Sequence, residues 1–301
     1  MQHVIVFSTS QPKKPLTNSI IERLLIDHGQ EIAETGIAEQ DIEWLQPDHA
    51  AQIMVSTNAH SSLAGLRAAA DGIGIDVNMV ATNNRRKKLL IADMDSTIIT
   101  DESLDEMAAR AGIGAAVAEI TARSMNGELN FEEALEARVA MLAGKPATLF
   151  DDTLAATQLI DGAQILVRTM RNHGAKCYIV SGGFMPIATP VAESCGFHAA
   201  HANDMDIAEG QIVGTVKKPI LGRNAKAEIM ADYCQQLQLH SDDVAAIGDG
   251  ANDLAMLQIA GMGVAFRGKP LLRNAISLQL NHTDLTGLLF LQGYKVTDFS
   301  N

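Results

Sequence analysis

Short apolar runs alternate with amphipathic stretches along most of the chain. Four such runs, each bounded by turn residues, lie at 89–92, 177–180, 244–247 and 263–266. Runs of this length and setting indicate buried strands, and the stretch 161–173 between two of them has helical spacing with Gly174 as its expected C-cap. This alternation predicts an α/β fold with a Rossmann-like, doubly wound parallel sheet. Ligands of such a sheet bind beyond the carboxyl ends of its strands.

A helical block follows the first run. Residues 100–158 contain almost no strand signal and three amphipathic segments, at 103–110, 115–124 and 130–142. An insertion at this point predicts a helical cap, at about 100–158, that lies over the catalytic edge of the sheet. Further along, residues 203–216 have the pattern of a β-hairpin with Glu209-Gly210 at its turn.

The first 84 residues have a different order of elements. They show strand patterns at 4–8, 32–37, 51–57 and 75–81 and helix patterns at 17–28 and 61–70. The order βαββαβ is that of a ferredoxin-like α+β sandwich. We therefore predict two domains, at 1–84 and 85–301, of which only the second carries a cluster of catalytic residue types.

Composition and charge narrow the function classes. The 301 residues are 47% hydrophobic and carry a formal net charge of −13, which argues against nucleic-acid binding. Neither a membrane-spanning run nor a signal-peptide pattern is present, and three cysteines are too few for a disulfide framework, so we expect a cytoplasmic protein. An acidic protein that binds an anionic substrate needs positive charge at the site, from a metal ion or from individual Lys and Arg side chains.

Three of the four apolar runs end on residues suited to phosphate chemistry. The first ends at Asp93-Met94-Asp95-Ser96-Thr97, where two carboxylates can hold Mg²⁺ or attack an electrophile. The second ends at Ser181-Gly182-Gly183, a hydroxyl and backbone amides at an expected strand-to-helix turn. The third ends at Gly248-Asp249-Gly250-Ala251-Asn252-Asp253, in which Asp249 is placed to bind a hard cation. The fourth run has no catalytic candidate at its end.

Each of these strings, taken alone, has an ordinary structural explanation. The two aspartates would be loop or capping residues, and Ser181-Gly182-Gly183 would be a turn. Lys226, which opens a helix between the second and third strings, would be a solvated surface lysine. Their succession at the ends of predicted parallel strands favours one shared site.

These strings resemble the four motifs of the haloacid dehalogenase (HAD) superfamily of phosphotransferases, over about residues 89–266. Within it the closest likeness is to the phosphoserine phosphatase family. The additional signs are Glu102, Ser124-Met125-Asn126-Gly127-Glu128, and Phe131-Glu132-Glu133-Ala134-Leu135 leading to Arg138. Residues 1–84 resemble, more weakly, the ACT-like domain of longer members.

The resemblance implies a role for each residue. Asp93 would be the nucleophile, and Asp95 the general acid and then the base that activates water. Because Asp95 must be protonated when the alcohol leaves, we expect neighbouring carboxylates to raise its pKa. Mg²⁺ would be held by Asp93, Asp249 and the main-chain carbonyl of Asp95, with Asp253 nearby. The implied substrate contacts are Ser181, Gly182, Lys226 and Asn252 to the phosphoryl group, Glu102 to the ammonium, Arg138 to the carboxylate, and Met125 and Phe131 around the pocket.

The implied reaction is hydrolysis of O-phospho-L-serine to L-serine and phosphate, the last step of serine synthesis. One alternative is a phosphotransferase that passes the phosphoryl group to another alcohol such as homoserine. A second is a regulatory amino-acid-binding protein without catalysis. For residues 1–84 the hypotheses are a serine sensor and a dimerisation module; we favour the second, which would make the protein a homodimer, because no ligand-binding cluster is evident there.

Overall fold

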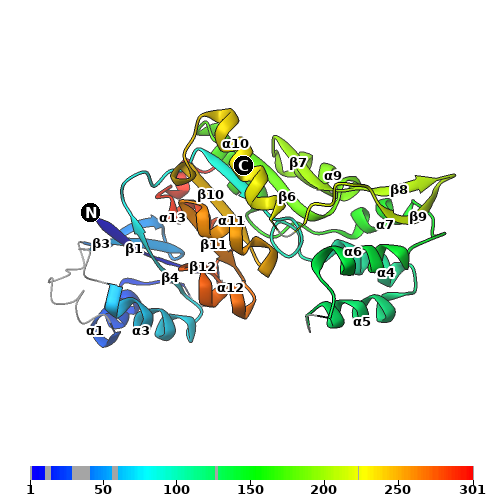
Figure 1. Cartoon of the computed structure of the whole chain (residues 1–301). Helices are drawn as coiled ribbons and strands as arrows, with labels where there is room; N and C mark the ends of the chain where they lie inside the picture. Colours follow the sequence, from blue (N-terminus) through cyan, green and yellow to red (C-terminus); the bar gives the residue numbers. More distant parts are fainter. Residues whose placement is uncertain are drawn as a thin grey trace.

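The structure, a computed structural model, describes residues 2–10, 15–28, 41–55, 60–125, 128–222 and 224–300, with the side chains of 60, 61, 124 and 125 excepted. Figure 1 shows two larger sheets that lie side by side, with a lobe of helices and a hairpin beyond the larger one. Within the described ranges, every helix is too short or too polar to span a membrane.

The larger sheet has six parallel strands in the order β12-β11-β10-β5-β6-β7. Its strands are β5 Leu89–Ala92, β6 Lys176–Phe184, β7 Ala199–Asn203, β10 Val244–Gly248, β11 Met262–Phe266 and β12 Leu278–Leu280. The helices around it are α8 Ala163–Asn172, α9 Met185–Cys195, α10 Ala225–Leu237, α11 Leu254–Ile259, α12 Pro270–Ala275 and α13 Gly287–Leu291. The predicted doubly wound parallel sheet is confirmed, and all four apolar runs are strands.

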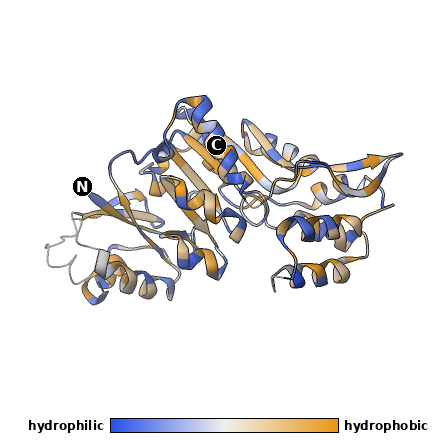
Figure 2. Ribbon diagram, in the orientation of Figure 1, coloured by the Kyte–Doolittle hydropathy of each residue, from blue (hydrophilic) through white to orange (hydrophobic). Residues whose placement is uncertain are grey.

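Alternate residues of each central strand face opposite layers of helices, which is why the runs are apolar throughout. Leu89 and Ile91 of β5 belong to a core with α10, α11 and α12. Leu90 and Ala92 belong to a core with α8, α9 and α13. Figure 2 shows the hydrophobic colour along these strands. A sheet buried on both faces leaves its strand ends as the place for chemistry.

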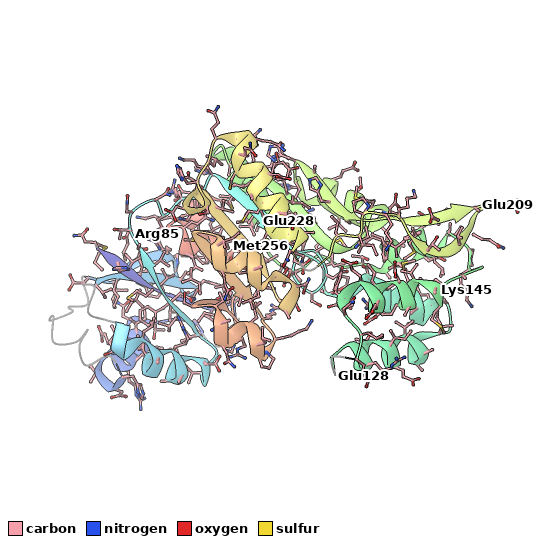
Figure 3. All side chains as sticks on the ribbon, in the orientation of Figure 1. Arg85, Glu128, Lys145, Glu209, Glu228 and Met256 are labelled. Carbon is pink, nitrogen blue, oxygen red and sulfur yellow. The ribbon has the colours of Figure 1, made fainter. Side chains whose placement is uncertain are left out.

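The segment between β5 and α8 is helical, as predicted, and forms the lobe in Figure 1. It contains α4 Ser103–Arg110, α5 Gly114–Met125, α6 Phe131–Ala140 and α7 Leu149–Ala156. Asn130 begins α6 with a capping box, because its side chain and that of Glu133 each accept the other residue's N–H at 2.9 Å. The predicted hairpin, β8 Met205–Ala208 and β9 Gln211–Val216, packs on α6, and Figure 3 shows Glu209 at its outer tip.

Two details of the larger sheet are informative at the residue level. β6 continues to Phe184, so Ser181-Gly182-Gly183 lie in an irregular end of the strand and not in the expected turn. Within this irregular segment Gly183 donates its N–H to the Ser181 hydroxyl at 2.9 Å. Gly174, after α8, has the expected left-handed conformation (φ 89°).

The second sheet has the strand order β2-β3-β1-β4. Its elements are β1 His3–Ser8, α1 Asn18–His28, β2 Glu43–Gln46, β3 Ala50–Val55, α3 His60–Asp71 and β4 Asp76–Ala81. The βαββαβ order agrees with the prediction. The strand predicted at 32–37 lies outside the described residues, and the structure has β2 at a place where the sequence pattern indicated none.

Both faces of this second sheet are covered. Ile5 and Phe7 of β1 pack in a core with α1 and α3. Val4 and Val6, which point to the other face, belong to the core that contains α8, α9 and α13. The apolar run in β1 therefore reflects burial between its own helices and the rest of the chain.

Buried polar contacts join the two sheets along the edge strand β12. The Asp76 carboxylate, at the start of β4, accepts the N–H groups of residues 281–283 at 2.8 to 3.0 Å. The Asn78 side chain and the Gln279 backbone exchange two hydrogen bonds, of 2.7 and 2.8 Å. Arg85, labelled in Figure 3, joins the same two parts at another place, where it donates to Oε1 of Gln52 in β3 and to the carbonyls of Phe290 and Leu291 in α13. Because the buried Asp76 and Asn78 side chains are paired with backbone groups of residues 279–283, this contact is specific rather than a loose apolar packing.

Candidate active site

The carboxyl ends of β5, β6 and β10 meet α4 and α6 of the helical lobe around a cavity of about 130 Å³. This volume is below the range of typical drug-sized pockets, so the cavity suits one small molecule. Its lining includes the predicted residues Asp93, Asp95, Glu102, Phe131, Arg138, Gly182, Asp249 and Asn252. Ser181, Lys226 and Asp253 are buried in contact with this lining. The side chain of Met125 lies outside those that the structure describes.

Asp93 directly follows β5 and is tied to two other elements. Its N–H donates to the carbonyl of Ile247 in β10 at 3.0 Å. Its side chain is only 6% exposed, and Oδ1 lies 2.7 Å from the ammonium of Lys226, in the first turn of α10. The same ammonium lies 2.6 Å from Oδ1 of Asp253. A buried lysine therefore bridges two buried carboxylates, which gives each of them a cationic hydrogen-bond partner.

The pKa shifts in this triad have opposing causes. Burial, reinforced by the charge of Asp253, raises the pKa of Asp93 well above its ordinary value. Burial lowers the pKa of Lys226, but the carboxylates of Asp253 and Asp93 outweigh it and raise that pKa above the ordinary value. Lys226 is thus held as an ammonium, and two carboxylates share its single positive charge.

Asp253 reaches back over the end of β10, and the glycines before it make room for it. The Gly250 N–H donates to Oδ2 of Asp253 at 2.9 Å. A Cβ on Gly248 would lie 2.3 Å from Cγ of Asp253, so only glycine fits at the last position of the strand. The glycines in this string therefore serve the close approach of a carboxylate to the backbone.

Three buried residues form an acidic group that suits a metal ion. Carboxylate oxygens of Asp93, Asp249 and Asp253 lie within 4.8 Å of one another. Oδ2 of Asp93 and Oδ1 of Asp249 have no hydrogen-bond partner among the described residues. Carboxylate oxygens are ligands that hard divalent cations such as Mg²⁺ prefer, so the donor set fits. The side chain of Asp95 is not part of this group, so only its main-chain carbonyl remains for a metal.

Asp95 is held between the lobe and β6. Its Oδ1 accepts the Ser103 N–H at 2.8 Å, and its Oδ2 accepts the Ser181 hydroxyl at 3.3 Å. Burial, followed by the charge of Glu102, raises the pKa of Asp95 to about 6 despite these hydrogen bonds. The direction matches the expectation, but burial and not a neighbouring carboxylate is the larger cause. A carboxyl group with such a pKa can both give and take a proton near neutral pH.

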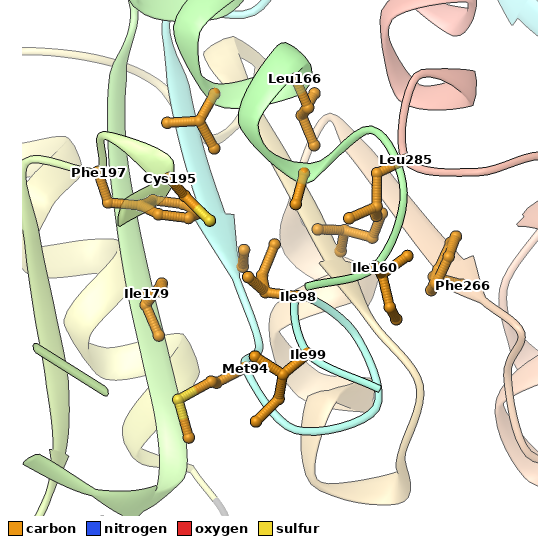
Figure 4. Close-up of a cluster of buried hydrophobic side chains, with 14 of the residues drawn as sticks. Met94, Ile98, Ile99, Ile160, Leu166, Ile179, Cys195, Phe197, Phe266 and Leu285 are labelled. Carbon is orange, nitrogen blue, oxygen red and sulfur yellow. The ribbon is translucent and has the colours of Figure 1, made fainter. Parts of the chain in front are cut away.

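Buried apolar side chains anchor the loop after β5, which carries Asp93 and Asp95. The carbonyl of Met94 accepts the N–H groups of Thr97, Ile98 and Ile99 at 3.2, 2.8 and 3.0 Å. Figure 4 shows Met94, Ile98 and Ile99 among buried apolar side chains that include Ile160. Met94, Ile98 and Ile99 are fully buried, whereas Asp93 and Asp95 line the cavity, so the apolar residues of the loop anchor it beneath its two aspartates.

The end of β6 approaches the site through small residues. A Cβ on Gly183 would lie 2.9 Å from Oδ2 of Asp95, and one on Gly182 would lie 3.2 Å from the ring of Phe131. Ser181 is 1% exposed. The loop after β5 approaches Gly183 most closely, and helix α6 makes a tighter than usual contact at Gly182, so small residues suit this backbone.

Two charged side chains of the lobe reach the same cavity. Glu102, the N-cap residue of α4, accepts the Ser96 hydroxyl at 3.0 Å. Arg138, on α6, is 19% exposed, and its nearest carboxylate oxygen in the described part of the chain, on Asp105, is 3.8 Å away. The residues predicted to meet an ammonium and a carboxylate are therefore brought together by the fold.

Two polar residues of the cavity were not predicted from the sequence. Lys269, which follows β11, has its Nζ 3.1 Å from Oδ2 of Asp249 and 3.8 Å from Oε1 of Glu102. Contrary to expectation, the fourth apolar run therefore does bring a charged group to the site. A search that continued for three residues beyond the end of the run would have found Lys269. Ser103 is 2% exposed, and its hydroxyl has no partner among the described residues; its sequence context gave no signal.

Comparison with known proteins agrees with this geometry. Residues 87–261 match the family model of haloacid dehalogenase-like hydrolases. A phosphoserine phosphatase of Mycobacterium tuberculosis is 42% identical over 209 residues, which is 69% of this chain and 51% of that protein. A phosphoserine phosphatase of Lactococcus lactis is 36% identical over 203 residues, which is 67% of this chain and 94% of that protein. The chain thus spans about half the length of the mycobacterial relative.

A solved structure covers nearly the whole fold. A HAD-family hydrolase of Salmonella enterica serovar Typhi has a TM-score of 0.85 and 25% identity, over 96% of this chain and 98% of that one. The shared fold therefore includes the N-terminal sheet. The family match covers more than half of the chain and contains the acidic strand ends from Asp93 to Asp253. This chain belongs to the haloacid dehalogenase-like hydrolases.

Proposed function

We propose that the protein hydrolyses O-phospho-L-serine to L-serine and phosphate, with Asp93 as the nucleophile. The observation that carries this proposal is that residues from the strand ends and residues from the helical lobe line the same cavity of about 130 Å³. The strand ends supply groups for a phosphate, and the helical lobe supplies Glu102 and Arg138 for a zwitterion. The similarity to phosphoserine phosphatases over the same residues supports it.

In the first chemical step a carboxylate oxygen of Asp93 is the nucleophile. This oxygen attacks phosphorus, and the bond from phosphorus to the serine oxygen breaks, which leaves an aspartyl-phosphate. Asp95 gives its proton to the departing oxygen, so serine leaves as the neutral alcohol. In the second step Asp95 takes a proton from water, the water oxygen attacks phosphorus, and the bond to Asp93 breaks to release phosphate.

Negative charge spreads over the phosphoryl oxygens during both steps. Lys226, Ser181, Asn252 and the Gly182 backbone are the groups that we assign to these oxygens, because each lies in the cavity wall or touches it. Mg²⁺ held by Asp93, Asp249 and the main-chain carbonyl of Asp95, with Asp253 nearby, would supply the positive charge that lets a carboxylate approach an anionic phosphate.

The lobe selects the alcohol part of the substrate. The planar guanidinium of Arg138 can bond both oxygens of a carboxylate, and Glu102 can accept hydrogen bonds from an ammonium. A cavity of about 130 Å³ leaves little room for a sugar phosphate. Charge and size therefore both favour a small phosphorylated amino acid.

A phosphate-release assay over a substrate panel tests the proposal. With Mg²⁺ we expect turnover of phosphoserine, slower turnover of phosphothreonine because of its extra methyl group, and none of hexose phosphates; a chelator should stop the reaction. Homoserine added as an acceptor separates hydrolysis from phosphoryl transfer, and formation of phosphohomoserine would contradict the hydrolase proposal. Failure to turn over any phosphomonoester would favour the non-catalytic amino-acid-binding alternative.

Replacing Arg138 by Met should raise the KM for phosphoserine roughly 10- to 100-fold with little change in kcat, since a charge-assisted bond is worth about 1.5–3 kcal/mol. Phosphoethanolamine lacks the carboxylate, so its KM should change by less than about threefold. Arg110→Met, which removes an exposed ion pair with Glu106 on α4, is the matched control. The measurement is the steady-state kinetics of both variants with both substrates. If Arg138→Met raised the KM for phosphoserine and for phosphoethanolamine equally, a contact of Arg138 with the substrate carboxylate would be ruled out.

We further propose that residues 1–84 form a domain of their own and that residues 85–301 form the catalytic domain. The separate apolar core between the second sheet and helices α1 and α3 supports this division. The docking of Asp76 and Asn78 on the loop and strand around β12 supports a scaffolding role for the N-terminal domain.

A further inference from the structure

A second cavity, of about 380 Å³, lies at the amino-terminal edge of the larger sheet. Its charged lining comes from Arg168 and Arg171 of α8, Lys176 at the start of β6, and His198 just before β7. The opposite end of β6 carries Ser181 and the glycines of the catalytic cavity. We call this place the basic cavity; it lies at the other edge of the sheet from the active site.

The charge of the basic cavity contrasts with that of the chain. Its lining contains two arginines, a lysine and a histidine but no Asp or Glu, in a chain whose formal net charge is −13. Neither arginine nor the lysine forms an ion pair with a carboxylate in the described part of the chain. Cations that share a concavity without counterions repel one another and attract anions from solution.

Hydrogen-bond donors of basic side chains converge in this cavity, whose lining also contains the amide side chain of Asn172. Nδ1 of His198 accepts the Cys177 N–H at 3.1 Å, so in the neutral ring Nε2 carries the proton. That nitrogen lies 3.5 Å from the Lys176 ammonium. Burial, followed by the charges of Arg171 and Lys176, lowers the pKa of His198. An anion placed between these groups would relieve their mutual repulsion.

One of these cations, Arg171, already has a hydrogen-bond acceptor at a helix end. Arg171 lies in the last turn of α8 and donates to the carbonyl of Gly196 at the end of α9, which balances the partial negative charge there. The side chains of Arg168, Lys176 and His198 make no hydrogen bond to a helix-end carbonyl within the described ranges. Three of the four basic groups are therefore left for another partner.

We propose that the basic cavity binds a phosphate group with two negative charges, either as inorganic phosphate or on a small metabolite. Guanidinium groups match phosphate oxygens with paired N–H donors, and the lysine and histidine add two further donors. Because the cavity has no carboxylate to act as a nucleophile or to hold a metal ion, this site binds phosphate without transferring it. The proposal is independent of the reaction at Asp93.

The imidazole of His198 reports on this site directly. The full chain is titrated at fixed pH and ionic strength with inorganic phosphate in one arm and glycerol 3-phosphate in another, with NaCl as the blank. The Cε1–H NMR resonance of His198, assigned by its loss in His198→Gln, should shift and saturate. Saturation with phosphate alone assigns the site to the free ion, and saturation with both extends it to phosphate esters. Failure of both arms to produce a saturable shift overturns the proposal.

A charge-removal pair shows whether the arginines are responsible. Arg168→Gln/Arg171→Gln should raise the half-saturating phosphate concentration at least about tenfold and leave phosphate release from phosphoserine unchanged. Lys217→Gln/Lys218→Gln removes the same charge from exposed positions next to the hairpin and should leave the titration unchanged. An unchanged titration in the arginine variant, or an equal loss in the lysine variant, contradicts a local site. If the double variant does not fold, Arg168→Gln alone provides the same comparison.

Discussion

Asp93→Asn is expected to lower phosphoserine turnover on the order of 10⁴-fold or more while the fold stays intact. The amide has nearly the same shape as the carboxylate, and its oxygen can still accept the two hydrogen bonds that Oδ1 of Asp93 accepts from Lys226 and the Met94 N–H. It cannot form the acyl phosphate, because a neutral amide is a poor nucleophile toward phosphorus. The measurement is phosphate release, with circular dichroism as the check on folding.

A second readout separates covalent catalysis from simple electrostatic help. Acid quench of the wild-type chain during turnover of phosphate-labelled phosphoserine should leave label on the protein, and the Asp93→Asn variant should carry none. Asp232→Asn, an exposed site in α10, is the matched control and should behave as wild type. Turnover by the folded Asp93 variant at a rate near that of this control would refute the assignment of the nucleophile.

Lys226→Met should cost both activity and stability. The lysine side chain is 5% exposed and is the counterion of Asp93 and Asp253, so its removal leaves two buried carboxylates without a partner. Breaking a buried charge pair in this way destabilises by about 3–5 kcal/mol. Loss of the charged group that we assign to the phosphoryl oxygens should lower kcat by roughly 10²- to 10³-fold. Urea unfolding, in the presence of a chelator so that no metal ion replaces the lysine, measures the first effect.

A compensating change distinguishes the two losses. In Lys226→Met/Asp253→Asn one of the orphaned charges is removed, so stability should recover in part, whereas activity should stay low because the phosphate contact and a carboxylate of the acidic group are both missing. Lys218→Met removes an exposed lysine that pairs with Glu136 and should change stability by less than about 0.5 kcal/mol. Full recovery of activity in the double variant would show that Lys226 acts on the fold and not on the phosphate.

Strand positions were readable from the sequence because burial on both faces makes each strand a continuous apolar run. The runs at 89–92 and 244–247 therefore located β5 and β10 to within one residue. The aspartates that directly follow these runs were thereby placed at the carboxyl ends of the strands. Three helices of the lobe, α4, α5 and α6, were equally visible from their spacing, whereas α7 lay in the predicted helical block without a segment of its own. The strand β2 was missed because its four residues are partly exposed and carry no such pattern.

What the sequence by itself determined was the set of strand ends and the residue types on them, because both are local properties of the chain. Only the tertiary structure decided which charges meet. Lys226 has the local context of a surface lysine, and it is buried because α10 packs on the sheet and directs it between Asp93 and Asp253. Burial likewise sets the pKa of Asp95, and the return of the loop after β11 brings Lys269 to Asp249. Contacts between segments far apart in the chain depend on packing, which no local pattern records.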